Sequence, residues 1–83
     1  MVNEKQIEHK IENINYELVS FKLELGKRYN YYALDLYYKK PRSLRETLIT
    51  GSKNKVMIYL LGLEKRSELK SYVIGGKTIG KWY

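Results

Sequence analysis

The sequence predicts a small α+β domain in which a long N-terminal helix, an antiparallel β-hairpin, a second helix and a short β-prone tail follow one another (αββαβ). Three observations predict this class. Apolar residues recur at helical spacing up to residue 25, side chains with strand preference then alternate over residues 31–38, and a second apolar run follows Ser52. With 83 residues, the chain has the length of one domain, residues 1–83, and is too short for two.

The first 25 residues carry one apolar stripe with spacings of three and four residues, which places its members on one side of a helix. Asn3 is suited to cap this helix, and Gln6 stands at the capping-box position. Gly26 is suited to end it. We therefore predict a helix over residues 3–25, whose apolar side consists of Ile7, Ile11, Ile14, Leu18, Phe21 and Leu25.

The stretch YNYYALDLYY, residues 29–38, holds five of the nine tyrosines and shows the alternation that is typical of a strand. Pro41 breaks the pattern, and a second run over residues 44–50 predicts an antiparallel partner. If the helices cover the face that carries Leu34 and Leu36, the outward-pointing side chains are those of Tyr29, Tyr31 and Tyr37.

Ser52 is placed to cap a second helix from about Lys53 to Leu61, and we predict a break or kink near Gly62. The tail, residues 71–79, contains two short β-prone triplets around a Gly-Gly pair, which predicts a small hairpin or one added edge strand. Since an isolated two-stranded ribbon is only marginally stable, we expect both helices to cover one face of the sheet.

Catalytic and metal-binding groups are sparse. There is no cysteine, and His9, the only histidine, lies on the polar side of the first predicted helix. Asp35, the only aspartate, is expected to pair with a neighbouring Tyr or Arg. Gly76-Lys77-Thr78 resembles the end of a phosphate-binding loop, but Ser71 replaces the glycine that this pattern requires. We predict no enzyme activity, no catalytic residues, no cofactor and no metal site.

The charge distribution is uneven. The net charge is +7; residues 1–25 carry three Lys against five Glu (−2), whereas residues 26–83 carry thirteen Lys or Arg against four acids (+9). A basic body predicts a polyanionic or acidic partner, although lysines also keep small proteins soluble. The longest apolar run, residues 56–61, is too short to span a membrane, and no targeting segment is visible. We expect a cytoplasmic protein with no membrane partner.

The predicted hairpin and the start of the second helix combine aromatic rings with cations, as surfaces that bind single-stranded nucleic acid do. Tyrosine is also a frequent anchor of protein interfaces, and the same rings could instead pack under the tail, with Trp82 and Tyr83 as a lid. The candidate residues for binding nucleic acid or another partner are Lys27, Arg28, Tyr29, Tyr31, Tyr37, Lys39, Arg42, Arg45, Lys53 and Lys55. A weak homodimer is expected through Ile7, Ile11 and Ile14.

A resemblance to known proteins rests on three segments of the chain. They are Tyr32-Ala33-Leu34-Asp35-Leu36-Tyr37, Thr50-Gly51-Ser52-Lys53 and Tyr59-Leu60-Leu61-Gly62. Over residues 29–63 the chain resembles small accessory proteins of phages and mobile elements of low-GC bacteria. The resemblance implies a short non-enzymatic protein, in the cytoplasm of a bacterial host cell, that either binds nucleic acid or inhibits a host protein or nucleoprotein complex. Inhibitors of the anti-defence type belong to the second group.

Overall fold

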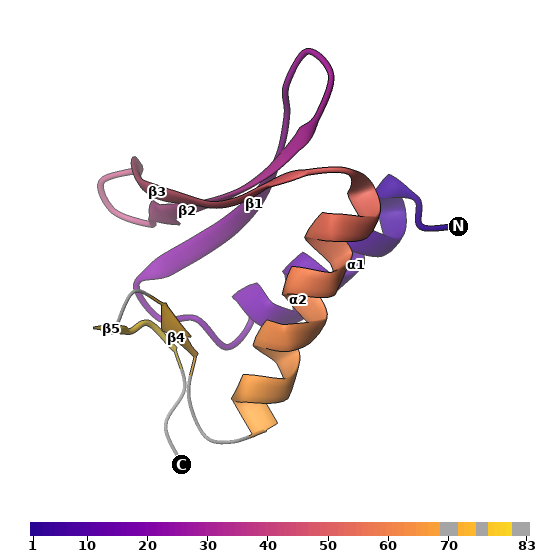
Figure 1. Ribbon diagram of the computed structural model, residues 1–83. Helices are drawn as coiled ribbons and strands as arrows, with labels where there is room; N and C mark the ends of the chain where they lie inside the picture. Colours follow the sequence, from indigo (N-terminus) through magenta and orange to yellow (C-terminus); the bar gives the residue numbers. More distant parts are fainter. Residues whose placement is uncertain (69–71, 75–76, 81–83) are drawn as a thin grey trace.

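The computed structural model describes residues 1–68, 72–74 and 77–80, and it confirms a small α+β domain (Figure 1). Two helices, a three-stranded antiparallel sheet and a two-stranded ribbon make up the fold. In chain order the elements are α1 (Glu4–Asn15), β1 (Phe21–Lys27), β2 (Tyr32–Tyr38), β3 (Ser43–Gly51), α2 (Lys53–Glu68), β4 (Val73–Ile74) and β5 (Lys77–Thr78).

The first helix begins as predicted and ends much earlier. The Asn3 side chain accepts a hydrogen bond from the Gln6 N–H (2.9 Å), and Gln6 Oε1 accepts from the Asn3 N–H (3.0 Å), which completes a capping box. However, α1 ends at Asn15, so the predicted helix over residues 3–25 is wrong in its second half. Gly26 does not end a helix; it lies within β1.

The apolar residues of segment 21–25 fit both a helix and a strand, and pairing with β2 makes the segment a strand. Phe21 and Leu25 continue the helical spacing, but together with Leu23 they also alternate with period two. In the fold, Leu23 lies opposite Leu36 of β2, and Leu25 lies opposite Leu34. This pairing adds a third strand to the predicted hairpin, and a sheet of three strands with one apolar face is far more stable than a ribbon of two.

The sheet has the order β1-β2-β3, so β2 is central and the other two strands are edges. The predicted antiparallel partner of β2 is confirmed as β3. The pairing between β2 and β3 is interrupted by two register shifts, between Leu34 and Asp35 and between Leu36 and Tyr37. Such irregularities bend an edge strand and make it a poorer template for a further strand.

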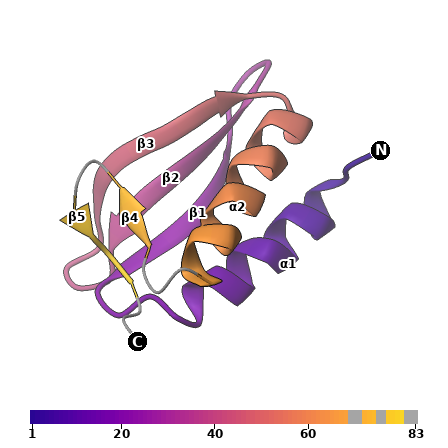
Figure 2. The same cartoon turned by 60° about the horizontal axis from the view of Figure 1, so that its bottom comes forward.

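Both helices pack on the same face of the sheet, as expected (Figures 1 and 2). Leu34 and Leu36 are fully buried under them. The β4–β5 ribbon extends this core beside the helices, where Tyr72, Ile74 and Ile79 join the same apolar cluster. Gly80 allows this close approach, since a Cβ there would lie 2.5 Å from the Tyr72 ring.

The second helix is longer than predicted. Ser52 caps it, as its Oγ accepts a hydrogen bond from the Lys55 N–H (3.3 Å). The predicted break near Gly62 is wrong, because α2 continues to Glu68. The core accounts for this continuation: Leu60 and Leu63, on either side of the glycine, are both fully buried, and their burial outweighs the cost of about 1 kcal/mol for a helical glycine.

The isoleucine stripe of α1 faces the core of its own chain. Ile7, Ile11 and Ile14 are buried beneath β1 and α2, so these side chains are not exposed to a second copy. The basis of the predicted homodimer through this stripe is therefore lost. No helix among the described residues is long and apolar enough to cross a membrane.

Candidate functional site

The sheet face opposite the helices, called the outer face below, carries polar and aromatic side chains. Strand alternation places Lys22 and Glu24 of β1 there, with Asp35 and Tyr37 of β2 and Thr47 of β3. Both helices lie on the other side of the sheet (Figure 1). Within the described ranges, no helix or ribbon covers this face. The alternative prediction, that Trp82 and Tyr83 form a lid over the tyrosines, lies outside the described residues.

Asp35 is the centre of a first polar cluster on the outer face. Its Oδ2 accepts a hydrogen bond from Arg28 Nη2 (3.0 Å), and its Oδ1 accepts from Thr47 Oγ1 (2.8 Å). The carboxylate is 2% exposed, so both oxygens need these partners. Gly26 makes room for the contact, because a Cβ there would collide with the Arg28 guanidinium and lie 2.8 Å from Asp35 Oδ2. The expected pairing of Asp35 with an arginine is confirmed.

Arg42 is the centre of a second cluster. Its Nη2 donates to both carboxylate oxygens of Glu24, at 3.1 and 3.0 Å. Its guanidinium carbon lies 4.3 Å from the centre of the Tyr37 ring, which is the geometry of a cation–π contact. Glu24 lies opposite Asp35 in the strand register, and two carboxylates so placed repel each other. Arg28 and Arg42 each neutralise one of them.

The electrostatics of the two arginines follow from these contacts. The hydrogen bond and charge of Asp35 raise the pKa of Arg28, and those of Glu24 raise the pKa of Arg42. Tyr31 and Tyr37 contribute smaller effects to the pKa of Arg28. The outer face thus carries four of the predicted binding residues: Arg28 and Tyr31 lie towards the β1–β2 turn, and Tyr37 and Arg42 lie towards the β2–β3 turn.

The other predicted cations lie elsewhere. Lys27 lies on the helix side, where its Nζ is 2.9 Å from Glu4 Oε2. The Lys39 Nζ donates to the Leu18 carbonyl oxygen (2.8 Å), and Arg45 lies 5.9 Å from the ring of Tyr38, which stacks on Phe21. Lys27, Lys39 and Arg45 therefore make their described contacts with Glu4, Leu18 and Tyr38, rather than with Tyr31 or Tyr37.

The remaining three predicted residues lie towards the end of the sheet where β1 turns into β2. Tyr29 is fully exposed in this turn, which the Arg28 N–H closes by donating to the Tyr31 carbonyl oxygen (2.9 Å). Lys53 and Lys55 lie in the first turn of α2, which begins just after β3. This end is about 20 Å from the turn that carries Lys39 and Arg42, because seven residues of β2 separate them.

Sequence reasoning missed the contribution of β1, since residues 21–25 were assigned to the helix. Glu24, Gly26 and Lys22 all belong to the outer face, and Lys22 lies opposite Tyr37 with no ion pair to any described residue. The signal that could have found them is the period-two alternation of Phe21, Leu23 and Leu25.

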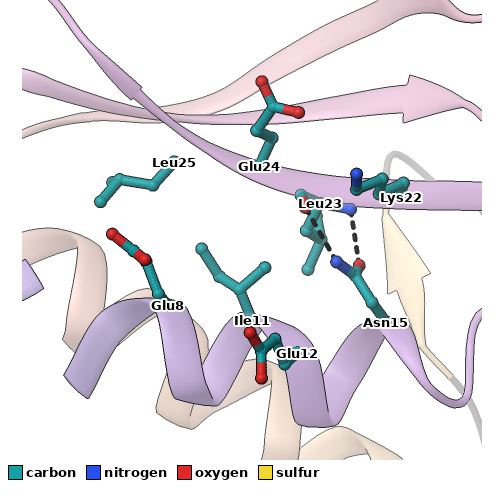
Figure 3. Close-up of a pocket in the computed structure, with 8 residues that line it drawn as sticks. All are labelled: Glu8, Ile11, Glu12, Asn15, Lys22, Leu23, Glu24 and Leu25. Atoms are coloured by element: carbon teal, nitrogen blue, oxygen red, sulfur yellow. Dashed lines mark hydrogen bonds between the residues drawn. The ribbon is translucent and has the colours of Figure 1, made fainter. Parts of the chain in front are cut away.

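A groove of about 290 Å³ separates α1 from the free edge of β1 (Figure 3). Asn15 closes one end of it, where its side-chain amide is hydrogen-bonded to Leu23. Glu8 and Glu12 stand on the helix side, and Ile11 points towards the strand. Residues 1–68, 72–74 and 77–80 contain no group of acidic or histidine side chains arranged to hold a metal ion.

The outer face offers groups that can bind a ligand: two guanidinium groups, an ammonium group and aromatic rings. The chain matches no family model, no curated protein and no solved structure. The residues on this face are therefore the basis for assigning a function.

Proposed function

We propose that this small basic protein is a non-enzymatic accessory protein that binds single-stranded nucleic acid through the outer face of its sheet. The observation that supports this most is the Arg42 guanidinium over the Tyr37 ring, 4.3 Å from its centre, on a sheet face that no described element covers. Aromatic rings and arginine planes on an open sheet are the platforms on which unpaired bases stack.

Two kinds of contact would contribute to binding. The ring of Tyr31 and the plane of Arg42 provide surfaces for bases, and each stacked base contributes about 1–3 kcal/mol. Lys22 and Arg42 provide positive charge for phosphates on the same face, and Lys40 and Arg45 lie at or beside the β2–β3 turn. Of these four, only Arg42 forms an ion pair with a described residue.

Titration of a short labelled single-stranded oligonucleotide at several salt concentrations tests the proposal. Two to four neutralised phosphates predict a log–log salt slope of about −1.4 to −2.8, at about −0.7 for each phosphate. Tyr31→Ala should keep this slope and lose about 1–3 kcal/mol of binding free energy, whereas Tyr31→Phe keeps the ring and should bind nearly as well as the wild type. Absence of binding at about 150 mM salt, the physiological range, would reject the proposal.

A second candidate function is docking onto another protein, with inhibition of a host protein or nucleoprotein complex as the result. The observation that favours it is that Arg28 and Arg42 are already neutralised by Asp35 and Glu24, which leaves the outer face less basic than the sequence predicts. Exposed tyrosines such as Tyr29 are suitable anchors for such an interface. Retention of a specific protein partner from a bacterial lysate after nuclease treatment would favour this function, and loss of all partners would favour nucleic-acid binding.

A further inference from the structure

The two arginines of the outer face differ in how firmly they are held. Arg28 binds a carboxylate, that of Asp35, which is 2% exposed and which also accepts a hydrogen bond from Thr47. Arg42 binds Glu24, and their side chains are 54% and 39% exposed. Removal of Arg28 would leave a buried charge unpaired, whereas Glu24 can be solvated by water when Arg42 leaves it.

We propose that Glu24 is a built-in competitor of the ligand's phosphate groups: its carboxylate binds Arg42 in the free protein and is displaced by a phosphate when nucleic acid binds. This inference rests on the proposed function and goes further, because it makes Arg42, and not Arg28, the arginine that exchanges partners. Arg28 keeps its contact with Asp35 and serves the fold.

The geometry of the Glu24 contact supports the exchange. The carboxylate presents two oxygens to the Arg42 guanidinium, at 3.0 and 3.1 Å, and a phosphate offers oxygens with a similar spacing and charge. The contact between Arg42 and Tyr37 does not involve Glu24, so the guanidinium can stay over the ring while its anionic partner changes. An exposed ion pair is also weak enough to be displaced without unfolding the sheet.

The matched pair Glu24→Gln and Glu46→Gln tests the inference. Both substitutions remove one negative charge from the sheet, but Glu46 is exposed on β3 and forms no ion pair with any described residue. With a labelled single-stranded oligonucleotide as the probe, Glu24→Gln should bind about twofold to fivefold more tightly than Glu46→Gln, which is the strength of an exposed ion pair expressed as affinity. Its salt slope should steepen by up to about 0.7.

The same comparison in an Arg42→Ala background shows whether Arg42 is the residue through which Glu24 lowers the affinity. If Glu24 acts by occupying Arg42, its removal should give no more gain than the removal of Glu46 once the arginine is absent. Thermal unfolding of each variant shows whether the fold is kept. Two outcomes would overturn this inference while leaving the proposed function in place. In the first, Glu24→Gln still gains more affinity than Glu46→Gln when Arg42 is absent. In the second, the wild type binds and both substitutions raise its affinity equally. Absence of binding by the wild type and every variant at about 150 mM salt would overturn the proposed function and this inference with it.

Discussion

The side-chain amide of Asn15 is hydrogen-bonded to both backbone groups of Leu23: its nitrogen donates to the carbonyl oxygen at 3.0 Å, and its oxygen accepts from the N–H at 2.7 Å (Figure 3). The amide thereby takes the place that a neighbouring strand would occupy at the free edge of β1. Edge strands with open backbone groups are templates for association with other chains. Asn15 closes one edge of the sheet, and the two irregularities of β3 protect the other.

Asn15→Ala should lower the free energy of unfolding by about 1–3 kcal/mol, since two partly buried hydrogen bonds are lost at once. The opened edge should also cause association that increases with protein concentration. Urea denaturation and sedimentation measure the two effects. Asn13→Ala is the matched control, because Asn13 is exposed on the same helix and forms no hydrogen bond that involves its side chain among the described residues. Equal stability of the two variants would contradict the role of Asn15.

Gly26→Ala should destabilise the protein by about 1–3 kcal/mol, because the added Cβ displaces the Arg28 guanidinium and leaves the buried Asp35 carboxylate short of a partner. Gly62→Ala is the contrasting change: nothing lies within 4 Å of its Cβ position in α2, so helix propensity should add about 0.5–1 kcal/mol. Denaturant midpoints measure both. If Gly26→Ala lowers the free energy of unfolding by the same amount in an Arg28→Ala background, displacement of Arg28 is not the cause of the loss.

The two faces of β2 should respond differently to truncation. Leu34→Ala should cost about 2–5 kcal/mol, as for other buried leucines, because the side chain is fully enclosed between the sheet and the helices. Tyr31→Ala should cost less than about 1 kcal/mol, since Tyr31 is 43% exposed and lies just before the strand. Thermal or urea unfolding of the two variants checks this. Comparable losses would mean that the tyrosine has a structural role.

Glu4 should make the stability of the fold dependent on pH in the acid range. The hydrogen bond from Lys27 is the largest cause that lowers the pKa of Glu4, followed by the hydrogen bond from the Tyr32 hydroxyl, at 2.8 Å from Glu4 Oε1. A carboxyl whose pKa is lower in the folded state stabilises the fold above its unfolded value of 4.5. This stabilisation is lost as the pH falls through the folded value.

Urea midpoints measured from about pH 6 down to pH 3 should therefore fall less steeply for Glu4→Gln than for the wild type, since the variant has no carboxyl to protonate at this position. Glu46→Gln is a matched change of charge that lies outside this cluster. If the urea midpoints of Glu4→Gln and the wild type fall equally steeply below pH 6, the contact of Glu4 with Lys27 and Tyr32 does not contribute to stability in solution.

The sequence by itself determined the features that depend on residues close together in the chain. Both helix starts were predicted because the hydrogen bonds between Asn3 and Gln6, and between Ser52 and Lys55, join residues three positions apart. The inward direction of Leu34 and Leu36 follows from alternation alone, as does the hairpin of β2 and β3. The class of fold, and the place of Tyr37 on the sheet face opposite Leu34 and Leu36, could be predicted from such local patterns.

Only the tertiary structure decided whether residues 21–27 form helix or strand. Their apolar pattern fits both periods, and the choice depends on pairing with β2 and on the burial of Leu23 against Leu36, thirteen positions away in the chain. The partners of the cations were decided in the same way: Glu24 meets Arg42 across the sheet, and Glu4 meets Lys27 across the two layers. Neither pairing is encoded in spacing along the chain, because each depends on how the strand between α1 and β2 is placed.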